Sequence, residues 1–203
     1  MELEAANQAL FQALNAPADL SGLSLALATG AAKYSIAALV AVLAWNWLRS
    51  GARDRRALTL VVFAVPSALA LNYLLGVMFP HPRPFMIGLG HTFLSHRPES
   101  SFPSDHATLM WTVALGMLLW SRWRWSAWLA VALAALTSWA RIFLGLHFPF
   151  DILGSMAVAA VAVGSLVPLR PMIEHLSRII GECLARIFIQ IKHRLRHLLN
   201  AVY

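Results

Sequence analysis

The sequence predicts an all-α fold, a polytopic integral membrane bundle of about five or six transmembrane helices with an amphipathic C-terminal helix. Hydrophobic residues make up 59% of the 203 residues and charged residues only 12%, and the mean hydropathy is +0.65. Charges this sparse cannot cover the surface of a soluble globule. The apolar residues also form runs that reach or approach the length needed to cross about 30 Å of hydrocarbon.

The predicted spans follow one another along the chain. They cover residues 31–48, 57–79, 106–120, 125–146 and 152–167. The stretch before them, 11–29, is only weakly apolar and is interrupted by Pro17 and Gly22. It therefore favours an interfacial helix lying on the membrane, with a sixth span as the alternative.

The basic residues predict how these spans are oriented. The net charge is +7 and the isoelectric point is near 10.8. Basic residues follow the first run, separate the third from the fourth and fill the tail: Arg49, Arg53, Arg55, Arg56, Arg122, Arg124, Arg170, Arg178, Arg186, Lys192, Arg194 and Arg196. By the positive-inside rule these regions are cytoplasmic, which explains the charge without a nucleic-acid partner, and we expect none.

The chain is expected to divide near residue 168. Residues 1–168 form the membrane-embedded domain, and residues 169–203 form a basic tail in which apolar and basic residues alternate at roughly helical spacing. This pattern predicts a cytoplasmic amphipathic helix on anionic inner-leaflet lipids, with packing on a partner or on the bundle as the alternative. Cys183 is the single cysteine, which excludes an intramolecular disulfide.

Three polar segments lie where an apolar run meets a loop, and the predicted topology puts all three on the extracytoplasmic side. They are HPRPF at 81–85, FPSDH at 102–106 and RIFLGLHFPFD at 141–151. Together they supply arginines, a serine, histidines and a carboxylate, which can bind a phosphate, attack it and protonate its leaving group. The sequence therefore predicts one site for phosphoryl transfer.

The arginines of these segments are expected to bind phosphate. Arg83 lies between Pro82 and Pro84, which hold the backbone extended. Its guanidinium could bind two phosphate oxygens through a pair of parallel hydrogen bonds. The alternative is an interfacial arginine that snorkels toward water. Arg141 falls inside the apolar run 125–146, where an ionisable side chain is costly and is usually functional or paired.

The second segment predicts the start of a helix. Ser104 is placed as the N-cap and the amides after it as an anion-binding helix end, with an ordinary helix start as the alternative. Asp105 suits the helix dipole but would repel a phosphate if it faced inward. We therefore expect its carboxylate to point away, toward an arginine or His96. His106, the next residue, favours the functional interpretation.

His147 and Asp151 form a candidate pair in the third segment. Their spacing of four would put both on one face of a continuous helix, but Pro149 is tolerated only in the first turn of a helix. We expect one span to end near Gly145, His147 to lie in the turn, and Asp151 to lie in the first turn of the next span. Asp151 could then orient the imidazole and leave one nitrogen basic, with a purely structural pair as the alternative.

The histidines of the outer loops predict no metal site. His81, His91 and His96 combine with His106 at no spacing that is typical of zinc ligands. We expect the chain to use no metal and no cofactor.

The ordered set of segments resembles the phosphatidic acid phosphatase type 2 superfamily. Its signatures are a Lys with Arg-Pro, a Pro-Ser-Gly-His, and a Ser-Arg followed after five residues by His and after three more by Asp. The corresponding residues here are Arg83, Pro84, Pro103, Ser104, Asp105, His106, Arg141, His147 and Asp151, within about residues 72–154.

Some positions depart from these signatures. Gly76 stands where the family has Lys, which removes one phosphate contact, Asp105 replaces the Gly, and Ala140 replaces the Ser. The combination of HPRPF, SFPSDHAT and a short chain is similar to the bacterial undecaprenyl pyrophosphate phosphatases associated with bacitracin resistance. That branch commonly carries Asp in place of the Gly.

The resemblance implies a role for each matching residue. The implied catalytic residues are His147, His106 and Asp151, and the implied phosphate-binding residues are Arg83, Arg141, Ser104 and Asp105. His147 would form a phosphohistidine while His106 protonates the leaving lipid phosphate. The implied reaction is metal-independent hydrolysis of undecaprenyl pyrophosphate on the outer side of the bacterial inner membrane, which recycles the cell-wall lipid carrier.

Other functions stay open at this point. One is a phosphatase or phosphotransferase for another lipid, such as phosphatidate, phosphatidylglycerol phosphate or lipid A phosphate. The other is a non-catalytic lipid carrier or transporter, which would need the arginines but not His147 and Asp151.

Overall fold

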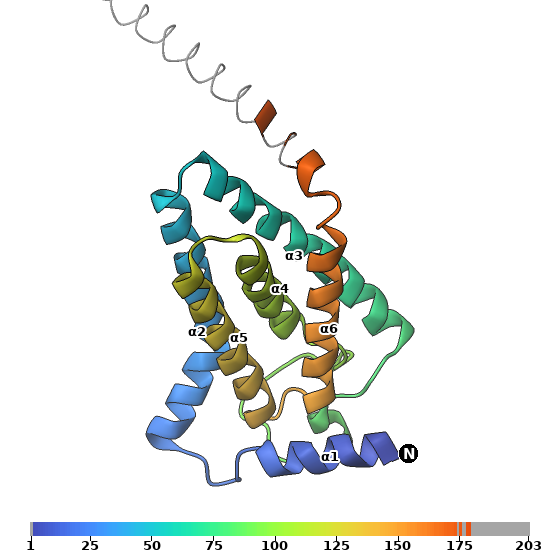
Figure 1. Ribbon diagram of the computed structural model, residues 1–203. Coiled ribbons are helices and arrows are strands. Elements are labelled where there is room, and N and C mark those ends of the chain that lie inside the picture. The colour runs from blue at the N-terminus through green and yellow to red at the C-terminus, as the bar shows by residue number, and fades with distance from the viewer. Residues whose placement is uncertain (1, 174, 176–177, 180–203) are drawn as a thin grey trace, which may run out of the picture. The chain divides into compact units, whose positions relative to one another are not determined.

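The computed structural model describes residues 2–173, 175, 178 and 179, and the elements in that part of the chain are all helices (Figure 1). They are α1 (Glu2–Leu14), α2 (Gly22–Arg49), α3 (Ala52–Met78), the 3-10 helix η1 (Pro84–Ile87), α4 (Asp105–Trp120), α5 (Arg124–Phe143) and α6 (Pro149–Ser165). The predicted all-α class is confirmed.

The bundle combines long outer helices with a short central one. Among the described residues, Gly22–Arg49, Asp54–Met78 and Arg124–Phe143 are long and apolar enough to cross a membrane, and Pro149–Ser165 is apolar but shorter. The short helix α4 packs against α3, α5 and α6, and Figure 1 shows it between α5 and α6. Most of its 16 residues are buried, so its neighbours provide most of its surroundings.

The helix predicted over 11–29 is wrong in its bounds. α1 already ends at Leu14, and α2 begins at Gly22 and continues through the first predicted span. Gly22 has a positive φ of 60°, a backbone conformation that favours glycine and interrupts a helix. The predicted segment is therefore split between two helices. In Figure 1, α1 crosses beneath the lower ends of α5 and α6, which it contacts.

The chain separates into two compact units, residues 1–166 and 167–203. The bundle and the candidate site belong to the first unit. The amphipathic helix predicted for the tail falls largely outside the described residues, and Cys183 lies outside them.

The turn between α5 and α6 packs against the long connection between α3 and α4. Gly145 in this turn has a positive φ of 79°, and a Cβ there would collide with the carbonyl oxygen of His91. The amide of Phe93 donates to the carbonyl of Leu144 across the same contact, at 3.2 Å. Glycine is therefore needed here both for its conformation and for the close approach, and the approach holds the connection between α3 and α4 against the third polar segment.

Candidate active site

His147 lies where the sequence predicts it, in the turn that ends α5. The amides of Leu146 and His147 both donate to the carbonyl of Arg141, at 3.0 and 3.3 Å, and so close the end of the helix. Pro149 is in the first turn of α6, as predicted. His147 is 2% exposed, so the surroundings of its ring are set by protein groups.

Asp151 caps the helix that carries it. Its Oδ2 accepts a hydrogen bond from the amide of Phe148 at 2.7 Å and a second, short one from the hydroxyl of Ser101. The same oxygen lies 3.5 Å from Nδ1 of His147. A carboxylate in the first helical turn is stabilised by the free amides there, and this position also turns it toward His147.

The contacts of His147 determine which ring nitrogen carries the proton. Nδ1 lies 3.0 Å from the carbonyl oxygen of Ser101, which can only accept. Nε2 lies 3.0 Å from Nη1 of Arg83, which can only donate. In the neutral ring, Nδ1 therefore carries the hydrogen and Nε2 offers a lone pair.

The electrostatic surroundings keep this lone pair available. Burial lowers the pKa of His147, because the imidazolium loses its hydration in the protein. The hydrogen bond and charge of Asp151 raise the pKa, and the guanidiniums of Arg83 and Arg141 lower it. The net shift is downward, so the ring stays neutral below the ordinary histidine range.

Arg83 is built into the site by backbone groups and is only 4% exposed. Its guanidinium donates to the carbonyls of Glu99, Ser100 and Leu146, each at 3.2 Å. Its Nη2 also lies 3.6 Å from the carboxylate of Glu99. The arginine is therefore a fixed part of the site, unlike a snorkelling side chain that reaches for solvent.

Arg141 is also buried, at 5% exposed, and it lies in the last turn of α5. Its Nε has no hydrogen-bond partner among the described residues. A buried guanidinium with an unused donor is costly unless something binds it. An anionic ligand would satisfy it.

Ser104 and His106 lie at the start of α4. Ser104 is the N-cap, and its Oγ accepts from the amide of Ala107 at 3.5 Å. Its amide and carbonyl bond the hydroxyl of Ser155, at 2.9 and 3.0 Å, which fixes this helix end to α6. His106 is half-buried and interacts electrostatically with Arg83 of the first segment and with Arg141 and His147 of the third. The second segment therefore meets the other two.

The predicted partner of Asp105 is wrong. Its carboxylate accepts a hydrogen bond at 2.6 Å from Asn72 of α3, not from an arginine or His96. Asn72 also donates to the carbonyl of Pro103 and accepts from Thr108. This buried amide ties α3 to the start of α4. No sequence pattern predicted this contact, because Asn72 lies outside all three segments.

Gly76, which stands at the position of the family's lysine, is a packing contact. A Cβ there would lie 3.3 Å from the carbonyl oxygen of Phe102, so the small residue lets α3 approach the connection. Beside it is a cavity of about 250 Å³ whose lining includes Asn72, Glu99 and Asp105. Where the family has a lysine side chain, this chain therefore has a close contact between α3 and the backbone of Phe102.

Sequence reasoning also missed residues of the connection between α3 and α4. Ser101 contacts both His147 and Asp151, and the ring of His96 lies 6.4 Å from that of His147. Nothing in the spacing of the segments signals these contacts, because they depend on how the connection folds back. Within the described part of the chain, no three His, Cys, Asp or Glu side chains are grouped as metal ligands.

The fold defines the chain as a polytopic helical membrane protein. It belongs to the PAP2 superfamily, which it matches over residues 56–173. It is 37% identical over 162 residues to YbjG of Escherichia coli (strain K12), provisionally named an undecaprenyl-diphosphatase, covering 78% of this chain and 80% of that one. It is 34% identical over 152 residues to undecaprenyl-diphosphatase BcrC of Bacillus subtilis (strain 168), covering 72% and 77%. The family predicted from the motifs is confirmed.

Solved structures show the same fold. LpxE of Aquifex aeolicus has a TM-score of 0.64 with 21% identity, over 78% of this chain and 92% of that chain. A transmembrane PAP2-type phosphatidylglycerolphosphate phosphatase of Bacillus subtilis has a TM-score of 0.58 with 17% identity, over 88% of each chain. The helical bundle is therefore an architecture that transmembrane PAP2 proteins share.

Proposed function

We propose that the chain hydrolyses undecaprenyl pyrophosphate to undecaprenyl phosphate and phosphate, without a metal, through a phosphohistidine on His147. The observation that carries the proposal is the neutral, buried imidazole whose Nε2 faces Arg83 while Nδ1 is held by Ser101 and Asp151. This is the geometry of an oriented nitrogen nucleophile. The names of YbjG and BcrC support the choice of lipid.

In the first step, Nε2 of His147 attacks the terminal phosphorus and the bond from phosphorus to the bridging oxygen breaks. His106 gives a proton to that oxygen, so undecaprenyl phosphate leaves. In the second step, His106 takes a proton from water, the water oxygen attacks the phosphohistidine, and phosphate and the neutral imidazole are released. Atoms and charges balance without any other reactant.

The arginines stabilise the charge that spreads over the equatorial oxygens of the transferred group. In the free protein Nη1 of Arg83 donates to the nitrogen that would attack. Substrate binding must therefore exchange this hydrogen bond for one to a phosphate oxygen. The exchange frees the lone pair only when a phosphate is present. Arg141 supplies its unused donor, Ser104 and the amides near His106 complete the cradle, and Asp105 borders it.

The proposed location is the outer side of the bacterial inner membrane, with the tail on anionic inner-leaflet lipids. The distribution of basic residues supports this orientation, because they flank the ends of the helices opposite the three segments. A reporter fused after Tyr203 should stay cytoplasmic. An external reporter would contradict the proposed side of the site.

The activity is tested by phosphate release from undecaprenyl pyrophosphate by detergent-purified protein in EDTA, with phosphatidate as the second substrate. Release that persists in EDTA and is abolished in His147→Ala is expected, with undecaprenyl pyrophosphate the better substrate. His91→Ala is the matched control, since it removes a loop histidine whose hydrogen bonds to described residues are made by its backbone. A preference for phosphatidate would support another lipid phosphatase, and lipid binding without release would support a carrier.

A further inference from the structure

His81 presents a buried nitrogen that the proposed reaction does not use. Among the described residues, its Nδ1 is one of the buried side-chain atoms without a hydrogen-bond partner, with Oδ1 of Asn46 and Nε of Arg141. The phosphate would satisfy Arg141. A buried polar atom without a partner calls for an explanation, and for His81 the neighbouring charges supply one.

Acidic groups from two different helices face the ring of His81. Its Nδ1 lies 3.9 Å from Oδ1 of Asp151, the oxygen that faces away from His147, and its Nε2 lies 3.3 Å from the carboxylate of Glu4. Phe148 closes the remaining side, with ring centroids 5.3 Å apart. Asp151 therefore stands between two imidazoles, one on each oxygen.

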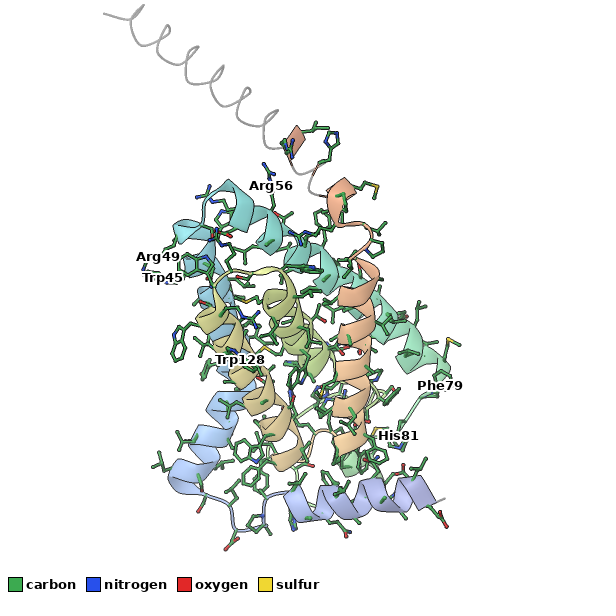
Figure 2. The ribbon with its side chains drawn as sticks, viewed as in Figure 1. Trp45, Arg49, Arg56, Phe79, His81 and Trp128 are labelled. Carbon is green, nitrogen blue, oxygen red and sulfur yellow. The ribbon has the colours of Figure 1, made fainter. Side chains whose placement is uncertain are left out.

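The backbone and α1 hold His81 in this place. The amide of His81 donates to the hydroxyl of Ser100, and its carbonyl accepts from the amide of Ser101 at 2.7 Å. These two hydrogen bonds fix the backbone at His81. Figure 2 shows His81 near α1 and the lower end of α6. Glu4 belongs to α1, and α1 docks on the first turn of α6. There, Oδ1 of Asn7 accepts a hydrogen bond from the amide of Phe150 at 3.0 Å.

We propose that His81 is a positioning residue for the reaction proposed above: its Nδ1 faces Oδ1 of Asp151 and polarises that carboxylate electrostatically, while Glu4 of α1 holds the His81 ring. A hydrogen or positive charge beside Oδ1 draws the carboxylate's charge partly away from His147. His147 then binds a proton less readily and remains a neutral nucleophile at lower pH. Through Glu4, α1 would then help to set the pH range over which the enzyme is active.

A matched pair of substitutions separates the two ring nitrogens. In His81→Asn the amide nitrogen can stand near the position of Nδ1, and in His81→Gln it stands near that of Nε2. We expect His81→Gln to lower kcat by about tenfold or more with little change in KM, and to move the acidic limb of the pH profile upward. His81→Asn should restore most of kcat and the position of that limb.

Glu4→Gln tests the link to α1. Glu4→Gln should lower kcat less than His81→Gln does when it is made in the unmodified protein. It should lower kcat no further when it is added to His81→Gln, because Glu4 acts through His81. Equal behaviour of the Asn and Gln variants, or losses of activity that follow melting temperature while the acidic limb stays fixed, would overturn the proposal.

A second readout does not depend on the reaction. The NMR titration of the His147 ring, assigned by its loss in His147→Ala, should move to higher pH in His81→Gln and stay in place in His81→Asn. Failure of the unmodified protein to release phosphate would reject the proposed function alone. An unchanged titration in His81→Gln would reject the role of His81.

Discussion

The two histidines of the proposed site are held in opposite ways. His147 is 2% exposed, and its ring contacts Arg83, Ser101 and Asp151. His106 is half-buried, and no side-chain hydrogen bond links its ring to a described residue. A nucleophile gains from a fixed ring because attack has one direction, whereas a group that gives a proton and takes it back needs room to move.

Because of this contrast, we expect changes around His147 to act through geometry and changes at His106 to act through proton transfer. The turn between α5 and α6 is short and bonded on both sides by the connection from α3. The start of α4 is fixed in its backbone by Ser155, but this fixation leaves the His106 ring unbonded. Substitutions can therefore distinguish effects on the geometry of His147 from effects on proton transfer by His106.

The largest effect is expected from His147→Ala. Removing the proposed nucleophile should lower phosphate release by at least about a thousandfold, because the nitrogen that would carry the phosphoryl group is gone. Radiolabelled substrate and rapid acid-free quenching should trap a phosphoenzyme in the unmodified protein and none in the variant. A labelled phosphoenzyme in His147→Ala would assign the nucleophile to another residue.

A smaller effect that depends on the leaving group is expected from His106→Ala. Loss of the general acid should cost about 10²- to 10⁴-fold with a lipid pyrophosphate. An aryl phosphate whose leaving group needs no proton should recover much of this loss, while His147→Ala should gain nothing from it. If both variants respond equally to the leaving group, the proposed division of roles is wrong.

Local sequence patterns predicted where His147 and Asp151 lie in the fold, but not the residues that contact them. Pro149 and the spacing of His147 and Asp151 placed the turn correctly, because proline position and helix periodicity are local properties. The partners Ser101 and Asn72 could not be predicted, because each is brought in by a segment distant in sequence.

The same distinction explains the errors in the fold. Hydropathy identified α4, α5 and α6 within a few residues, since their apolar runs end at clear breaks. It failed for α1, whose 13 residues bury only Asn7 and Phe11. That helix is defined by what it docks on, and its sequence alone resembles a solvated segment.

The pH profile should respond to charges on both sides of His147. Its pKa lies below the ordinary value of 6.5, so the acidic limb of kcat/KM should fall below pH 6.5 in the unmodified protein. Arg83 lowers this pKa and Asp151 raises it. Arg83→Gln should therefore move the limb upward, and Asp151→Asn should move it downward, in profiles measured with undecaprenyl pyrophosphate. Shifts of the same sign would show that His147 does not set this limb.

The smallest effect is expected from Ser101→Ala, which removes one hydrogen bond from Asp151 and a longer contact of 3.4 Å from Nδ1 of His147. The amide of Phe148 still bonds the carboxylate, and the carbonyl of residue 101 still bonds His147. One hydrogen bond is worth about 1 kcal/mol, which corresponds to about fivefold in kcat.

Ser95→Ala is the control for that substitution, since Ser95 lies in the same connection and its side chain makes no hydrogen bond to a described residue. Steady-state phosphate release should be unchanged in Ser95→Ala and reduced by that factor in Ser101→Ala. A loss in Ser101→Ala as severe as that of His147→Ala would mean that one hydroxyl, and not several shared contacts, holds the carboxylate. The contrast between a densely held nucleophile and a loosely held acid would then fail, because His147 would be no more securely placed than His106.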